Sequence, residues 1–196
     1  MTVHDGWQGR YYEDFVVDDV YRHALGRTVT TTDNIWFTLL TQNTAPLHFD
    51  HEYAARTAFG RPLVNSTFTL ALVAGQSVAD ISQNVFANLG WSDVQLPNPV
   101  FEGDTIRSQS HVLAKRPSAS RPDVGLLTVR TEGRNQRNEI VITFERTLLV
   151  YRRGHGPRST DGAVPASEDR PTDRRLDDAE DVRDGTDTDQ TEMGDD

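Results

Sequence analysis

The chain of 196 residues contains no cysteine. It can therefore form no disulfide, no thiolate metal site and no cysteine nucleophile. No apolar run reaches the roughly 20 residues that span a membrane as a helix, and residues 1–5 lack the charged and then apolar pattern of a secretion signal. We therefore expect a cytoplasmic protein with no membrane partner.

Lysine is nearly absent, since Lys115 is the single lysine among 20 Lys and Arg residues. The clusters of basic residues that neutralise nucleic-acid phosphates are missing, so we expect no nucleic-acid partner. Negative charge gathers at the C-terminus, where residues 158–196 hold 14 acidic residues and 5 arginines. Basic residues that are almost all arginine, together with this acidic end, resemble a halophilic composition.

Aromatic residues and isoleucine are also missing from residues 158–196, which contain one leucine. Such a segment cannot bury enough apolar surface to offset the entropy that it would lose on ordering. We therefore predict a folded domain over residues 1–155 and an acidic, disordered C-terminal tail over residues 156–196. The domain is long enough to bury one sizeable core.

Two helices are predicted early in the chain. Apolar residues recur with helical spacing from Ile35 to Leu40, after Thr32 or Asp33 as the N-cap. This helix should end near Asn43, because a proline follows shortly and disfavours helix in the residue before it. A short helix over about residues 51–59 should then stop at a glycine.

A longer helix is predicted from Phe68 to Ile81, where apolar residues cover nearly the whole circumference. A helix that is apolar on all sides is buried. The small residues Ala71, Ala74 and Gly75 would let another surface approach closely. We predict that this segment is the central helix of the core.

Strand patterns surround these helices. A bent strand, or two short ones, is expected between residues 17 and 31. Longer strands are predicted over residues 85–91, 103–114, 124–132 and 139–151, and short turns between such strands indicate an antiparallel meander. A curved antiparallel sheet wrapped around one long central helix satisfies this order, and that arrangement is the α+β hot-dog fold.

A polar stretch that ends in a histidine lies between the two early helices. It reads Asn43-x-x-Pro46-Leu47-His48-x-Asp50 and is followed by Gly60-Arg61-Pro62-Leu63-Val64. Further along, the chain reads Pro99-Val100-Phe101-x-Gly103-Asp104-Thr105. These motifs, in this order, resemble those of the MaoC-like, (R)-specific enoyl-CoA hydratase family over residues 10–153.

The resemblance implies a mechanism. In that family an aspartate and the histidine hold one water molecule, which adds across the double bond of an enoyl thioester. The enolate-like thioester oxygen needs a donor such as an N–H at a helix N-terminus, here Ser66. The resemblance implies Asn43 and His48 as the catalytic residues. It also implies an acyl-CoA substrate, of which coenzyme A is a part, and no separate cofactor.

Asn43 departs from the family pattern, because it stands where the family has aspartate. A carboxamide cannot accept the proton of water, so His48 or the substrate itself must be the base. We hypothesise that the substrate carries its own carboxylate near the reacting carbons. An aspartate about 4 Å away would repel that carboxylate by about 4 kcal/mol in a partly shielded site.

Residues 41–50 and 60–67 also resemble the mesaconyl-CoA hydratase branch of the family. Such enzymes interconvert mesaconyl-CoA (2-methylfumaryl-CoA) and β-methylmalyl-CoA, whose acyl groups are dicarboxylic, as the hypothesis requires. Further candidates for binding the substrate are Gln42, Arg61 and Asn65.

The residues also allow other interpretations. His48 could be structural, Asn43 could end a helix, Ser66 could be a cap, and Arg61 could be solvated instead of pairing with a carboxylate or a CoA phosphate. His48 and His51 are too few for a metal site, so we expect no metal.

The functional alternatives are a hydratase of straight-chain 2-enoyl-CoA, a hot-dog acyl-CoA thioesterase, and a non-catalytic acyl-CoA-binding protein. A lone hot-dog unit leaves one sheet edge open and its helix partly bare. A homodimer, or a multiple of a dimer, is therefore expected.

Overall fold

The computed structural model describes residues 2, 4 and 6–157, so the predicted tail lies, from residue 158 onward, outside the described residues. Its helices and strands include short 3-10 helices and one π-helical turn, η3. In chain order they are η1 (Tyr12–Asp14), β1 (Val20–Arg22), β2 (Arg27–Thr28), α1 (Thr31–Leu40), η2 (Pro46–His48), α2 (His51–Ala55), α3 (Ser66–Gln76), η3 (Val78–Ser82), β3 (Val85–Gln95), β4 (Thr105–Pro117), β5 (Val124–Arg134) and β6 (Ile140–Tyr151).

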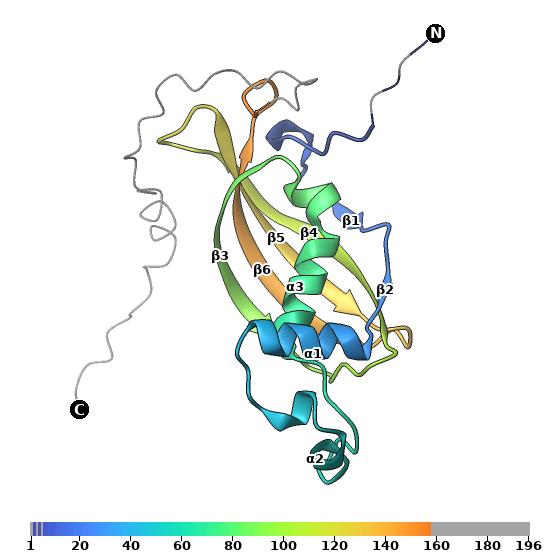
Figure 1. Cartoon of the computed structure of the whole chain (residues 1–196). Coiled ribbons are helices and arrows are strands. Elements are labelled where there is room, and N and C mark those ends of the chain that lie inside the picture. Colours follow the sequence, from blue (N-terminus) through green and yellow to red (C-terminus); the bar gives the residue numbers. More distant parts are fainter. Residues whose placement is uncertain (1, 3, 5, 158–196) are drawn as a thin grey trace, which may run out of the picture.

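One antiparallel sheet contains the strands in the order β1-β4-β5-β6-β3, and β2 also pairs with β4. Of the two predicted alternatives between residues 17 and 31, the two short strands are the one that the structure has. The sheet curves around α3, which lies on its concave face (Figure 1). This is the predicted curved sheet around a central helix.

The four long strands are not one continuous meander as predicted. β4, β5 and β6 pair in sequence, but β3 pairs with β6 instead of β4. The connection after β3 runs to the opposite edge of the sheet and passes the chain just before α3, where Val64 N–H donates to the Val100 carbonyl at 2.9 Å. β3 is an edge strand, because among the described residues it pairs only with β6.

The first two helices differ from prediction at their ends. α1 begins at Thr31 because Thr30 is its N-cap, so neither predicted cap is correct. The Thr30 hydroxyl accepts from Asp33 N–H, and the Asp33 carboxylate accepts from Thr30 N–H, which is a capping box. α2 contains only His51–Ala55, and the chain then turns to Gly60, whose φ is +67°.

The central helix also has shifted ends. α3 begins at Ser66, two residues before the predicted start, because Asn65 is the N-cap. It ends at Gln76 and does not continue as α-helix to residue 81. The Ser77 hydroxyl donates to the carbonyl of Ala74 at 2.6 Å, and such local bonds compete with helical hydrogen bonding.

The prediction that the central helix is buried on all sides is wrong for this chain. Phe68 and Val73 are buried against the sheet, as predicted. However, the opposite face exposes Ala71, Gly75 and Val78. The sequence pattern therefore indicates a surface that a single unit leaves uncovered.

The concave side of the sheet holds two apolar clusters. One includes Val73 and Phe144, and the other includes Ile81 and Leu148. On β6, Arg146 stands between Phe144 and Leu148 on the same face, because side chains alternate along a strand. Polar side chains separate the clusters, and we call this set the polar layer; its buried members are His23, Ser77, Ser110, Thr131 and Arg146.

His23 is at the centre of a hydrogen-bonded chain in the polar layer. Its Nδ1 lies 3.0 Å from an oxygen of Asp80, which accepts, and its Nε2 lies 2.9 Å from the Ser110 hydroxyl, which donates. The Ser110 hydroxyl in turn lies 2.8 Å from that of Thr131. Asp80 also forms an ion pair with Arg10 at 2.8 Å. A neutral imidazole satisfies every one of these contacts.

Burial lowers the pKa of His23, an effect that the hydrogen bond to Asp80 and the charge of Asp80 oppose and that the charges of Arg146 and Arg10 strengthen. The folded pKa therefore lies below the value of about 6.5 for unfolded histidine. The contribution of His23 to the free energy of unfolding is complete above that pH. It is lost as the pH falls toward the folded pKa, because the unfolded chain then binds a proton that the folded one does not.

We predict that His23→Gln removes part of this acid sensitivity. The free energy of unfolding, measured in urea at pH 7.5 and pH 5.5, should decrease less between the two values in this variant than in the wild type. His111→Gln is the control, because that half-exposed histidine faces Asp18 at 3.5 Å outside the polar layer. An equal loss in the wild type and His23→Gln would contradict the assignment.

Candidate active site

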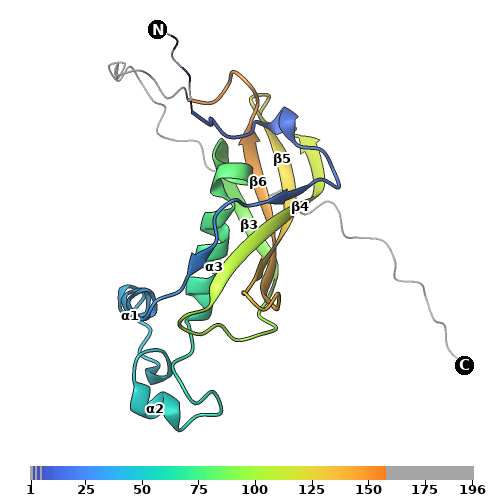
Figure 2. The same ribbon diagram turned by 90° about the vertical axis from the view of Figure 1, so that its right-hand side faces the viewer.

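The candidate residues lie just after α1, on η2, in the segment that follows α2 and at the start of α3. Figure 2 shows α1 beside the N-terminal end of α3 and α2 projecting beyond one end of the sheet. The polar stretch around residues 42–50 is therefore held outside the sheet but next to the central helix. It depends on hydrogen bonds, more than on the apolar core, for its position.

Asn43 follows a turn that ends α1. Gln42 has φ +54°, and the N–H groups of Gln42 and Asn43 donate to the carbonyls of Leu39 and Thr38, which is a Schellman motif. Thus Gln42, not Asn43, is the left-handed residue that ends the helix. The side-chain oxygen of Asn43 accepts from Ala45 N–H at 3.0 Å, so its NH2 group remains as a donor.

His48 is oriented by a single backbone acceptor. Its Nδ1 lies 2.7 Å from the carbonyl oxygen of Leu63. A carbonyl can only accept, so Nδ1 carries the proton and the lone pair of the neutral ring is on Nε2. Pro46 begins η2, the short 3-10 turn on which His48 lies. The geometry therefore prepares Nε2 to accept a proton from water.

The second motif fixes the position of Leu63. Leu63 forms an isolated antiparallel bridge with Phe101. Phe101 N–H in turn donates to a carboxylate oxygen of Asp104 at 2.9 Å, across a turn in which Gly103 has φ +89°. Glycine is favoured at that conformation. The Gly-Asp motif therefore has a structural role, because it positions the carbonyl that orients His48.

Asp104 is buried and ionised. Burial raises its pKa, but the Phe101 N–H, the Gln136 amide and the Arg137 guanidinium outweigh that effect and lower the pKa overall. Gln136 and Arg137 donate to the same oxygen at 2.8 and 3.2 Å. The turn therefore keeps its charge, and its hydrogen bonds, at neutral pH.

Asn34 connects the parts of the site. Its role was not predicted from the sequence. This side chain is fully buried. Its NH2 donates to the carbonyls of His48 at 2.8 Å and Leu63 at 3.1 Å, and its oxygen accepts from Asn65 N–H at 2.9 Å. One amide thus joins α1, η2 and the start of α3. The only sequence signal was a polar residue on the inner side of an amphipathic helix.

Asn65 and Ser66 form the N-terminus of α3. The side-chain oxygen of Asn65 accepts from the N–H and hydroxyl of Thr67 at 3.0 and 2.6 Å. Within residues 2, 4 and 6–157, neither the buried NH2 of Asn65 nor the N–H of Ser66 has a hydrogen-bond acceptor. Free donors at a helix N-terminus stabilise negative charge, so this end of α3 suits a thioester oxygen.

The structure brings His48, Asn65 and Ser66 together through Asn34 and Leu63. Arg61 lies beside them, but its guanidinium stacks on the Phe101 ring, 4.1 Å from the centroid. The other two candidates, Gln42 and Asn43, lie at the end of α1. Across the described part of the chain, no hydrogen bond joins the side chains of Asn43 and His48.

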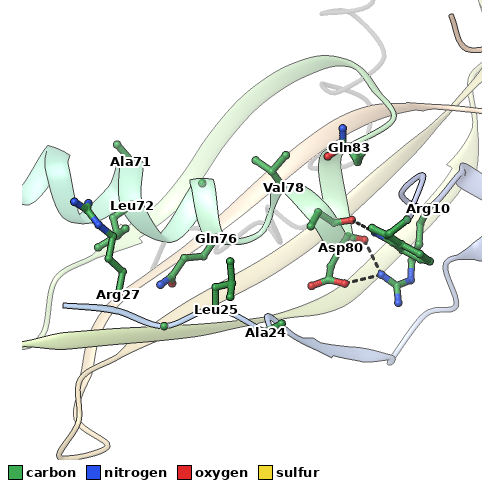
Figure 3. A pocket seen from close by; sticks show the side chains of 14 residues that line it. Arg10, Ala24, Leu25, Arg27, Ala71, Leu72, Gln76, Val78, Asp80 and Gln83 are labelled. Atoms are coloured by element: carbon green, nitrogen blue, oxygen red, sulfur yellow. Dashed lines mark hydrogen bonds and ion pairs between the residues drawn. The ribbon is translucent and has the colours of Figure 1, made fainter. Parts of the chain in front are cut away.

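A separate groove of about 970 Å³ runs along the exposed face of α3 (Figure 3). The segment Ala24–Arg27 faces Ala71, Leu72 and Val78 across it. The ion pair between Arg10 and Asp80 is at its far end. None of the predicted site residues lines this groove, so it is a feature of the uncovered helix face and not of the histidine site.

Among the described residues, no three His, Asp or Glu side chains are grouped so that they could hold a metal ion. The helices of that same part of the chain are too short or too polar to cross a membrane.

The fold defines the class of the protein. A MaoC domain protein from Chloroflexus aurantiacus is similar over 83% of this chain and 46% of its own, with 28% identity and a TM-score of 0.74. A Mycobacterium tuberculosis protein described as having a double hot-dog fold matches 82% of this chain and 53% of its own, with 21% identity and a TM-score of 0.69. The chain is thus a MaoC-like protein with the α+β hot-dog fold, as predicted.

The sequence defines the family more narrowly. The family model for mesaconyl-CoA hydratase matches residues 3–195, and the chain belongs to that family. Mesaconyl-CoA hydratase of Cereibacter sphaeroides is 32% identical over 158 residues, which are 81% of this chain and 44% of that protein. The chain spans about half the length of the curated relatives that it matches first.

We predict that Asn34→Ala disorders the site by removing its central amide. Two carbonyls and one N–H would lose their partner, so the free energy of unfolding in urea should fall by about 2–3 kcal/mol. Asn98→Ala is the matched control, because that exposed asparagine makes one bond, to the Ile140 carbonyl. A loss no larger than that of the control would contradict the role of Asn34.

Proposed function

We propose that this protein is a hydro-lyase that reversibly adds water to mesaconyl-CoA to give β-methylmalyl-CoA. The single observation that carries the proposal is the bond from His48 Nδ1 to the Leu63 carbonyl, which leaves Nε2 free as a base. The N–H of Ser66 at the start of α3, which has no acceptor among the described residues, supports it. Membership of the mesaconyl-CoA hydratase family supports this choice over the alternative substrates and activities.

The reaction needs one base and one oxyanion donor. His48 Nε2 removes a proton from water, and the oxygen bonds to C3 of the enoyl thioester as the C2–C3 π-bond breaks. The electrons move to the thioester oxygen, which the Ser66 N–H stabilises. The imidazolium then gives its proton to C2 and is neutral again. Addition of water changes no net oxidation state, so the step needs no redox cofactor, and coenzyme A is part of the substrate.

Asn43 is suited to a dicarboxylic substrate. Its oxygen is bonded to Ala45 N–H, so it presents NH2 hydrogens, which attract a carboxylate or hold the oxygen of the attacking water. An aspartate with the same geometry would present negative charge. We therefore assign Asn43 to orienting water beside the substrate carboxylate, and Gln42, Arg61 and Asn65 to contacts with the acyl-CoA.

The catalytic unit in this proposal is the domain of residues 1–155, paired with a second hot-dog unit. In the sheet of the described residues β3 has only one neighbour, and the exposed face of α3 carries the apolar groove. A second copy of the chain, in a homodimer or a multiple of it, would extend the sheet and bury that face. We place the activity in the cytoplasm.

We predict that His48→Ala reduces hydration of mesaconyl-CoA by about 10²–10⁴-fold, the usual contribution of a general base. The test is mass-spectrometric detection of the hydrated product across a panel of enoyl-CoA esters. His51→Ala is the control, because this exposed residue lies one turn away on α2 and should leave the rate unchanged.

Two outcomes of the panel would overturn the proposal. Release of free coenzyme A without a hydrated product, detected by a thiol reagent, would indicate a thioesterase. Binding of the esters without any product would indicate a non-catalytic protein. Full activity of His48→Ala would remove the base assigned here.

We also predict that Asn43→Asp changes substrate preference. Hydration of mesaconyl-CoA should fall about 10–1000-fold, which corresponds to ~1.4–4 kcal/mol of repulsion between carboxylates. Hydration of crotonyl-CoA, which has no carboxylate, should be unchanged or faster. Asn43→Ala is the control without added charge and should affect both esters alike. Faster turnover of mesaconyl-CoA by Asn43→Asp would refute the repulsion model.

A further inference from the structure

A cleft on the convex face of the sheet is lined by several arginines. It has a volume of about 320 Å³ and lies where β1 ends, β4 begins and β5 leads into the following turn. At the start of β4 the even-numbered residues are buried on the concave side, so Arg107 and Gln109 point away from α3. We call this cleft the arginine cleft; the charged residues that line it are Arg22, Arg107, Glu132 and Arg134.

The residues of the arginine cleft do not balance its charge. Arg107 and Arg134 are register partners on β4 and β5, so two like charges stand directly opposite each other, which is destabilising in a sheet. Arg134 turns toward Glu132 and forms an ion pair with it at 2.8 Å. Gln109 Nε2 donates to the same carboxylate oxygen at 2.9 Å. The single carboxylate of the cleft therefore already has its partners, and two positive charges remain in excess.

Arg22 and Arg107 carry these two charges. Within residues 2, 4 and 6–157, neither guanidinium forms an ion pair or a hydrogen bond. Arg22 is the register partner of Gln109, and Arg107 lies two residues before Gln109 on the same face, so both side chains reach one cleft. Acidic residues outnumber basic ones by 30 to 20 in the chain, so the lack of a carboxylate here is a property of this position.

Gly26 provides the surface on which the Arg107 side chain lies. A Cβ atom at residue 26 would stand 2.9 Å from Arg107 Cγ and 3.1 Å from its Cζ. β1 ends at Arg22 and β2 begins at Arg27, so Gly26 is in the break between the two short strands that pair with β4. The arginine therefore packs on backbone that has no side chain of its own, and this packing directs its guanidinium along the edge of the sheet.

We propose that the arginine cleft binds a phosphate group. Guanidinium groups form two-pronged, charge-assisted hydrogen bonds with phosphate oxygens, and Arg22 and Arg107 offer free donors from two strands. The side-chain NH2 of Asn138, which also lines the cleft, is a further donor. A phosphate monoester carries about two negative charges at neutral pH, as many as the cleft has in excess, whereas a carboxylate carries one. The bound anion would also relieve the repulsion between Arg107 and Arg134.

The arginine cleft lies at the same end of the sheet as the candidate active site. The β5–β6 turn lines it through Asn135 and Asn138 and lies at the end of the sheet where α1 is found (Figure 1). Other residues of that turn hold the Asp104 carboxylate, and with it the backbone that orients His48. Coenzyme A carries phosphates roughly 15–20 Å from its thioester, the reach of about five extended residues. The substrate is therefore one source of the anion, a point that rests on the proposed function, and a free phosphate ligand is the other.

The test titrates the full-length protein with inorganic pyrophosphate in a calorimeter at constant ionic strength. The wild type should bind it, and Arg107→Gln should weaken binding about 10–100-fold, the usual contribution of charge-assisted hydrogen bonds. Arg130→Gln is the matched control, because it removes the same charge from the same face of the sheet, but that arginine pairs with Asp93 and Glu145. It should leave the affinity unchanged. Arg107→Gln should unfold at the urea concentration of the wild type or a higher one, because it ends the repulsion from Arg134.

Titrations with coenzyme A and with pantetheine, its thiol arm without phosphates, identify the source of the anion. If the phosphates of the substrate occupy the cleft, coenzyme A binds more tightly than pantetheine, and Arg107→Gln removes that difference. If a separate ligand occupies it, pyrophosphate binds the wild type equally well when coenzyme A is present at saturation.

Two results would overturn the inference. One is that the wild type does not bind pyrophosphate. The other is an equal loss of affinity in Arg107→Gln and Arg130→Gln, which would indicate a general effect of charge. The pyrophosphate titration does not depend on turnover, so it stands even if the enoyl-CoA panel shows no hydration, and hydration without pyrophosphate binding would overturn only the arginine cleft. The two proposals can therefore fail separately.

Discussion

The candidate site depends on one hydrogen bond, from His48 Nδ1 to the carbonyl of Leu63. It fixes the tautomer of the imidazole and therefore decides which nitrogen can act as a base. The carbonyl itself is fixed three times: by the bridge of Leu63 to Phe101, by the Asp104 turn that holds Phe101, and by the Asn34 amide. Two motifs that are far apart in the sequence thus serve the orientation of one ring.

Electrostatics explains the remaining features of the site. The chain is acidic overall, with a formal net charge of −10. At the proposed catalytic end, however, the free groups are donors: the NH2 groups of Asn43 and Asn65 and the N–H of Ser66. Beneath the other end of α3 there is the unpaired cation Arg146. A neutral monocarboxylic thioester needs few of these donors, whereas an anionic acyl group can use those at the catalytic end.

Much of the fold could be predicted because its patterns are local. The strand period near two, with Gly and Pro between the segments, predicted β4, β5 and β6 to within a few residues at each end. Helix ends were less accurate, because Thr30, Asn65 and Ser66 lie in runs of residues that are all good caps. The pairing of β3 with β6 depends on the path of the connection across the end of the sheet, which no local pattern specifies.

The site was predicted from motifs only as far as the motifs extend. The motifs predicted His48, Asn65 and Ser66 as site residues, but Asn34 was missed because a single polar residue in an amphipathic helix has no distinctive spacing. Arg146 was missed for a related reason. In the alternating pattern of β6 an arginine suggests the solvent face, yet here it occupies the inward position between Phe144 and Leu148. Sequence alternation reveals which face a residue takes, but only its partners reveal why.

The uncovered face of α3 and the buried cation of the polar layer are both unfavourable features of an isolated unit. An apolar helix face exposed to water and a charge buried away from it are each unfavourable in an isolated unit. A second hot-dog unit would remove the first penalty. Trp91 connects the two, because it lies on the open edge strand and its ring covers the guanidinium of Arg146. Association of two units would therefore also close the sheet edge beside the buried cation.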